Sequence, residues 1–191
     1  MRAILREKLI AQGLALANVS KLYQSDAQRL VPAYQHWLNH CEQDLSSLRS
    51  PISLTLQAER TSLLAVLDGL VPEGIQHTKS TRKLHRAAAA RSIEKVSVLF
   101  QQQLEEIDRY FEQITEQLCQ SSAIIQSLQP QLYASLTPTT GAASIWHAMH
   151  DTQETLQIYN YLSAKVSASD RNYLLQDLVA RVLSNRSELF T

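Results

Sequence analysis

The sequence has 191 residues, of which 45% are hydrophobic and 19% are charged, as is common in folded globular chains. Its 18 Lys and Arg balance its 18 Asp and Glu, so net charge excludes a global field that would attract nucleic acid or a membrane. With only 4 Gly and 5 Pro, the chain lacks the turn residues of a β-rich fold. We therefore expect an all-α protein forming a single helical domain over residues 1–191.

Apolar residues at helical spacing predict six helices in chain order. They cover about residues 2–24, 32–49, 52–69, 80–128, 142–165 and 169–188, the last with Ser169 as its cap. Loops are expected at about 70–78 and 129–141, where Gly and Pro gather. The predicted architecture is an up-and-down bundle of five to six helices with one unusually long helix, about 80–128.

The long helix is the most informative feature, because residues 75–129 contain neither Gly nor Pro. If continuous, its ~50 residues would extend over roughly 75 Å. Two apolar rows run along it: Phe100, Ile107, Ile114 and Leu128 in one, and Leu104, Phe111, Leu118 and Ile125 in the other. A stripe of this width favours the spine of a bundle. A dimeric coiled coil is the alternative, and Ser121-Ser122 is where the helix could instead bend back on itself.

The N-terminal segment is basic and then apolar, which faintly resembles a signal peptide, but Glu7, Gln12 and Asn18 interrupt it. No apolar run approaches the ~18 residues of a membrane span. Cys41 and Cys119 are too few for a disulfide framework and are expected to be buried free thiols. These features favour a cytoplasmic protein without membrane contact.

Charge is distributed unevenly along the long helix. Its start carries six cations and one Glu, and the cations are Lys79, Arg82, Lys83, Arg86, Arg91 and Lys95. Acidic residues dominate further on, an order that opposes the helix macrodipole. Extending the apolar stripe backwards at 100° per residue places Arg82 and Arg86 on the core side. We therefore expect the segment at about 79–95 to project from the bundle and bind an acidic protein surface or phosphates, a solvated helix end being the plainer alternative.

One cluster has residue types suited to a metal: His147, His150, Asp151 and Glu154. On one continuous helix these four share a face, but it lies opposite Ile145 and Met149, so the side chains would point to solvent. They are weak candidates, and we expect no metal, no cofactor and no catalytic residue.

These observations predict a non-catalytic helical interaction or scaffolding subunit of a larger cytoplasmic assembly. Its partner would be a protein, either in a hetero-complex or in an antiparallel homodimer that pairs basic and acidic stretches. The alternative is a nucleic-acid-binding accessory protein that uses the basic 79–95 segment. An all-α enzyme is the third and weakest reading.

Overall fold

The computed structural model describes residues 2–70 and 80–188. Within these ranges the chain is all-α and contains eight helices. The helices are α1 (Arg2–Ser25), α2 (Leu30–Ser47), α3 (Ile52–Leu67), α4 (Thr81–Leu128), α5 (Pro130–Ala134), α6 (Gly141–Asp151), α7 (Gln153–Lys165) and α8 (Ala168–Glu188). None of these helices is long and apolar enough to cross a membrane.

The chain divides into two compact units. Residues 4–105 form the N-terminal unit, and residues 1–3 with 106–191 form the C-terminal unit. The prediction of one domain over residues 1–191 stays a prediction. The long helix itself is confirmed: α4 has 48 residues and continues without a break through Ser121 and Ser122.

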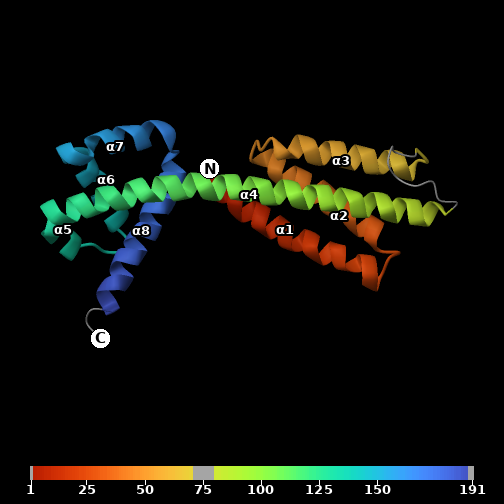
Figure 1. Ribbon diagram of the computed structural model, residues 1–191, viewed down its shortest axis with the longest axis horizontal. Coiled ribbons are helices and arrows are strands. Elements are labelled where there is room, and N and C mark those ends of the chain that lie inside the picture. Colours follow the sequence, from red (N-terminus) through yellow and green to blue (C-terminus); the bar gives the residue numbers. More distant parts are fainter. Residues whose placement is uncertain (1, 71–79, 189–191) are drawn as a thin grey trace. The chain divides into compact units, whose positions relative to one another are not determined.

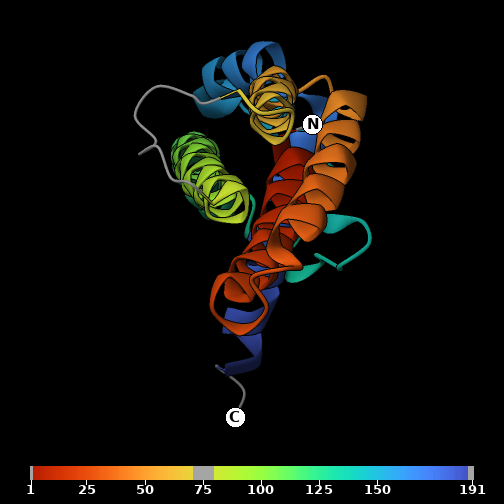
Figure 2. The same ribbon diagram turned by 90° about the vertical axis from the view of Figure 1, so that its right-hand side faces the viewer.

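The N-terminal unit is an up-and-down arrangement of four helices. α1, α2, α3 and the first half of α4 run side by side, each antiparallel to the one before (Figure 1). Viewed from the end of this unit, α1, α2 and α3 lie to one side of α4 (Figure 2). The side of α4 facing them is apolar, with Val96 and Phe100 buried, whereas Arg91, Glu94 and Val98 are exposed. The amphipathic pattern thus determines which side packs.

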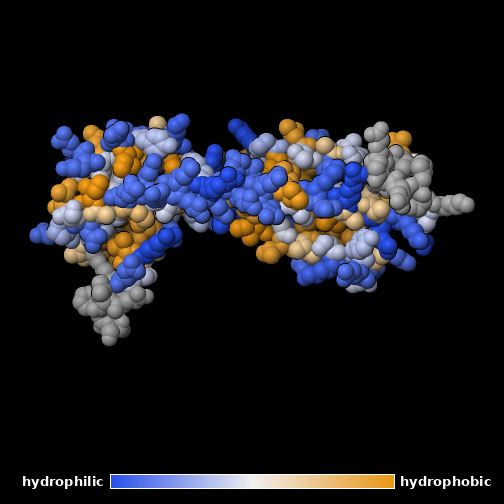
Figure 3. Space-filling model, viewed as in Figure 1, coloured by the Kyte–Doolittle hydropathy of each residue, from blue (hydrophilic) through white to orange (hydrophobic). Residues whose placement is uncertain are grey.

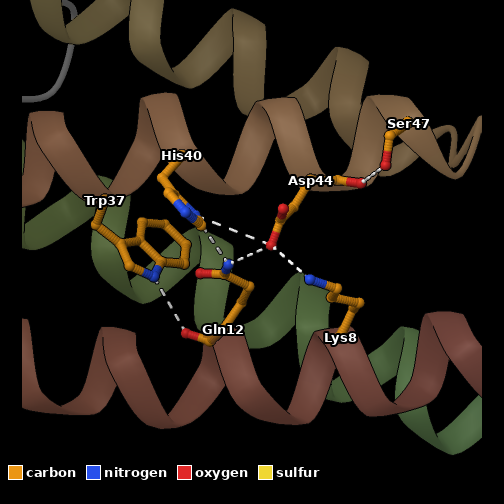
Figure 4. Close-up of polar contacts among 6 residues, drawn as sticks. All are labelled: Lys8, Gln12, Trp37, His40, Asp44 and Ser47. Atoms are coloured by element: carbon orange, nitrogen blue, oxygen red, sulfur yellow. Dashed lines mark hydrogen bonds and ion pairs between the residues drawn. The ribbon is translucent and has the colours of Figure 1, made fainter.

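A buried glutamine joins α1 to α2 (Figure 4). The side-chain amide of Gln12 donates from Nε2 to Oδ2 of Asp44 at 2.9 Å, and the backbone carbonyl of Gln12 accepts the indole N–H of Trp37 at 3.2 Å. Lys8 completes the cluster with an ion pair to Asp44 at 3.2 Å. Burial would raise the pKa of Asp44, but the hydrogen bonds from Gln12 and Lys8 outweigh it and lower the pKa. The one polar position in the α1 stripe is therefore explained by satisfied hydrogen bonds.

The C-terminal unit contains the second half of α4 and helices α5–α8. Along α4 the predicted rows are buried at Ile107, Ile114 and Ile125, whereas Leu128 at the helix end is 52% exposed. Ser122 of α4 and Tyr133 of α5 share a buried hydrogen bond between their hydroxyl groups. The pattern predicted the core of this segment correctly except at its last turn.

Three local features of the C-terminal unit differ from the sequence expectation. The expected helix 142–165 is split at Thr152, which is extended (φ −101°, ψ 121°), and the hydroxyl of Thr155 donates to the carbonyl of Met149 left open at the end of α6. The short helix α5 lies inside the expected loop 129–141. Cys119 is exposed, whereas Cys41 is buried as expected and burial raises its pKa to about 12.

Asp170 joins the start of α8 to the start of α1. Its carboxylate accepts the backbone N–H groups of Arg2 at 3.0 Å and Ala3 at 2.9 Å, and the Ser167 hydroxyl donates to it at 2.7 Å. The backbone N–H of Asp170 donates to the Ser167 hydroxyl in return, so Ser167 caps α8 in place of the expected Ser169. Burial would raise the pKa of Asp170, but these hydrogen bonds lower it to about 2. The carboxylate thereby satisfies backbone N–H groups at the start of α1, while the Ser167 hydroxyl satisfies one at the start of α8.

We expect Asp170→Asn to lower the free energy of unfolding at pH 7 by about 2 kcal/mol, because a buried charged acceptor of backbone N–H groups is lost. Because the folded pKa lies below the unfolded value, the advantage of Asp170 is full above about pH 4 and disappears as the pH falls towards 2. Urea unfolding at pH 7, 5 and 3, followed by circular dichroism, measures the difference. Asp177→Asn, in an exposed pair with Arg181 on the same helix, is the control and should cost less than about 0.5 kcal/mol. An equal Asp170→Asn effect at all three pH values would contradict the assignment.

Substituting alanine at two helical glycines, Gly141 and Gly13, is expected to change stability in opposite directions. A Cβ at Gly141, the first residue of α6, would lie 2.8 Å from Cγ1 of Val179, whereas a Cβ at Gly13 would have its closest contact at 3.9 Å from Phe100. We expect Gly141→Ala to destabilise the protein by about 1–3 kcal/mol through overpacking. Gly13→Ala should stabilise it by up to about 1 kcal/mol, because Ala favours the helix interior. Thermal melts would show shifts of opposite sign, and a raised midpoint for Gly141→Ala would mean that α6 and α8 pack less closely than described.

Candidate functional site: a cationic pocket at the start of α4

A pocket of about 420 Å³ lies in the N-terminal unit where α4 begins. Its volume is in the range of protein sites for small ligands or peptide side chains. One wall comes from the corner between α1 and α2, and the other from the first turns of α4. The lining residues are Ala27, Gln28, Val31, Arg82, Lys83, His85 and Arg86. Figure 3 shows hydrophilic side chains at this end of the unit.

The corner between α1 and α2 is held by backbone hydrogen bonds. The N–H of Asp26 donates to the Leu22 carbonyl at 3.0 Å, and the N–H of Arg29 donates to the Asp26 carbonyl at 3.1 Å. This turn places Ala27 and Gln28 at the pocket, and Val31 follows in the first turn of α2. Asp26 is the acidic residue that directly precedes Ala27 and Gln28 in sequence. Its side chain accepts the backbone N–H of Arg29, and it is not among the residues that line the pocket.

On the other wall, the orientation of α4 is set by its buried residues. Leu84 and Ala88 are 7% and 8% exposed, so the helix packs against the unit from its first turn. The segment at about 79–95 is expected from the sequence to project from the bundle, and these burials do not indicate a projection. At this end of α4 the buried residues are Leu84 and Ala88. Arg82 and Arg86 lie on the side that becomes the core further along, and here they line the pocket.

Among the described residues, three cations and no carboxylate line the pocket, so this lining is positively charged. Within the described ranges, neither Arg82 nor Lys83 forms an ion pair, and both are exposed. The Arg86 guanidinium carbon lies 4.9 Å from the centre of the Tyr23 ring, a cation–π contact that orients this half-buried side chain. The helix dipole adds partial positive charge at this end. The arrangement favours an anion.

The later cations of the basic segment have other roles. Lys95 donates from Nζ to Oε1 of Glu59 at 3.1 Å, and the Ser92 hydroxyl donates to Oε2 of the same carboxylate at 2.7 Å. Since the Ser92 proton is engaged there, the Tyr34 hydroxyl donates to Ser92, at 2.8 Å. Burial raises the pKa of Tyr34. Lys95 is therefore part of a network that joins α2, α3 and α4.

Of the six predicted contact residues, the pocket brings together Arg82, Lys83 and Arg86. Lys95 is paired with Glu59, and Arg91 is exposed but has an interaction of its own and does not line the pocket. Lys79 lies outside the described residues.

Sequence reasoning missed the other lining residues. His85 is the notable one, because its Nε2 atom is buried and has no hydrogen-bond partner in the described structure. Ala27, Gln28 and Val31 belong to a different helix corner, about fifty residues away in sequence. No local pattern connects them to α4, so only the tertiary packing could have found them.

The metal candidates do not lie on a single helix. His147, His150 and Asp151 end α6, whereas Glu154 begins α7 beyond the break at Thr152. Nδ1 of His150 lies 2.7 Å from Oδ1 of Asp151, and the His150 ring meets the edge of Tyr159. The hydrogen bond with His150 lowers the pKa of Asp151. Within the described ranges, no group of three or more His, Cys, Asp or Glu side chains could hold a metal ion.

Comparison with known proteins finds no matching family model, no similar curated protein and no similar solved structure.

We expect Ser92→Ala to lower the free energy of unfolding by about 1–3 kcal/mol, because the buried Tyr34 hydroxyl loses its acceptor. Ser97→Ala on the same helix is the matched control, since the Ser97 hydroxyl bonds only the Ile93 carbonyl of its own helix. Urea unfolding of both variants measures the difference. Equal effects of the two substitutions would show that the network around Lys95 contributes nothing specific.

Proposed function

We propose that the protein is a non-catalytic helical interaction subunit that binds an acidic protein partner through the pocket at the start of α4. The observation that carries the proposal is the grouping of Arg82, Lys83 and Arg86 around one pocket, where no carboxylate is among the described lining residues. Uncompensated cations at a partly enclosed surface attract anionic groups, and an arginine can bind a carboxylate with two parallel hydrogen bonds.

A localised group of cations suits a protein partner better than a nucleic acid. Binding to a duplex or a single strand draws on several phosphate contacts spread along a track. Here Lys95 is paired with Glu59, so the basic segment does not offer an unbroken row of available cations. Among the described lining residues there is no Phe, Tyr or Trp on which a base could stack, and His85, which does have an aromatic ring, has its Nε2 atom buried. Treatment with nuclease during purification distinguishes a protein partner from a nucleic acid.

The remaining parts of the proposal rest on sequence composition. The balanced charge and the absence of a membrane-spanning helix among the described residues fit a subunit of a cytoplasmic assembly. A carboxylate-rich partner surface would bind most strongly at low salt, since the exposed part of the interaction is screened. The partner is either a different protein, in a hetero-complex, or a second copy of this chain, in an antiparallel homodimer.

The proposal is tested by affinity purification of the chain from its native host, with and without nuclease. We expect protein partners that survive nuclease treatment and are lost when Arg82→Glu and Lys83→Glu are combined. The matched control combines Arg49→Glu with Lys165→Glu, which changes the net charge equally at exposed cations away from the pocket. This control should retain the partners.

Two results would contradict the proposal. If the captured material disappears with nuclease, the basic segment binds nucleic acid. If both double variants retain the same partners, another surface makes the contact. Circular dichroism of each variant confirms that its helical content is unchanged.

A further inference from the structure

We propose that the pocket at the start of α4 holds a short acidic segment of a partner protein, with carboxylates on its cations and an aliphatic side chain against Val31. This inference rests on the proposed function and specifies the chemistry of the partner.

The pocket has two unlike walls. Arg82, Lys83 and Arg86 supply positive charge from α4, whereas Ala27 and Val31 supply apolar surface from the opposite corner. Both apolar residues are partly exposed, so a ligand can still bury some of their surface. An occupant complementary to both walls carries anionic groups on one side and an aliphatic group on the other.

The size of the pocket supports an occupant larger than a single ion. A volume of about 420 Å³ accommodates a ligand with a body, whereas one phosphate would fill only part of it. A compact multivalent anion such as pyrophosphate would use the cations but leave the apolar wall hydrated. A peptide with acidic and aliphatic side chains uses both.

Charge spacing on α4 is also suited to a peptide. Arg82 and Arg86 are four residues apart and lie on the same side of the helix, with Lys83 beside them. Two neighbouring carboxylates can therefore be bound at once. The contact of Arg86 with Tyr23 holds one of the cations in place before the peptide arrives, which reduces the entropy lost on binding.

The test measures binding of two fluorescently labelled peptides to the full chain by fluorescence anisotropy. One peptide is Glu-Leu-Glu-Glu-Leu-Asp, and the other has glycine in place of both leucines and therefore the same charge. We expect the leucine peptide to bind on the order of tenfold more tightly, because a leucine side chain is partly buried. Inorganic pyrophosphate serves as the competitor that supplies charge without an apolar group.

Three variants separate the two walls. The combination of Arg82→Glu and Lys83→Glu should abolish binding of both peptides. Val31→Ser should weaken the leucine peptide severalfold and leave the glycine peptide unchanged. Gln28→Glu adds a carboxylate to the lining at an exposed turn residue, where the fold does not depend on it, and should weaken both peptides.

The inference is overturned if neither peptide binds, if the two peptides bind equally, or if pyrophosphate binds at concentrations where the leucine peptide does not. Its failure is distinguishable from failure of the proposed function. Equal binding of the peptides, together with partner capture that still depends on Arg82 and Lys83, removes the apolar contact but leaves the acidic partner. Capture that is insensitive to Arg82 and Lys83 removes the proposed function itself.

Discussion

Burial of the apolar side of α4 is the constraint on which both units depend. A helix cannot cover its own apolar stripe, so each half of α4 requires neighbouring helices. In the N-terminal unit α1, α2 and α3 lie to one side of α4 and bury Val96 and Phe100 (Figure 2). In the C-terminal unit Ile107, Ile114 and Ile125 are buried among the shorter helices. One continuous helix thus contributes to two cores.

The pocket lies at the first turns of α4, where the apolar stripe of this helix ends. In the first turns of α4 the buried residues are Leu84 and Ala88. The side of the helix that is apolar in later turns has Arg82 and Arg86 at this end, where both line the pocket. The corner between α1 and α2 faces these arginines with small and aliphatic residues. A cationic wall and an apolar wall therefore meet at the pocket. This combination is the physical basis of the proposal that the site binds a partner.

Polar groups inside the units fix how the helices pair. Glu59 joins Ser92 and Lys95 between α3 and α4, and Asp170 accepts the backbone N–H groups of Arg2 and Ala3 at the start of α1 and the Ser167 hydroxyl at the start of α8. Each arrangement uses a carboxylate whose oxygens are satisfied by several donors, as buried polar groups require. These carboxylates and Lys95 thus have partners within the fold, whereas Arg82 and Lys83 at the pocket are exposed and form no ion pair among the described residues.

The sequence by itself determined the all-α class, the long helix and most of its buried positions, because helical periodicity and the lack of Gly and Pro are local properties. It also indicated that Arg82 and Arg86 continue the line of the apolar stripe of α4, but not that Leu84 and Ala88 are the residues buried at that end. The break at Thr152 and the pairing of Lys95 with Glu59 came only from the tertiary structure, since neither has a local signal. The pocket likewise forms only because the packing of the helices places Val31 next to the start of α4, about fifty residues later in the sequence. No local pattern in the sequence predicts this contact.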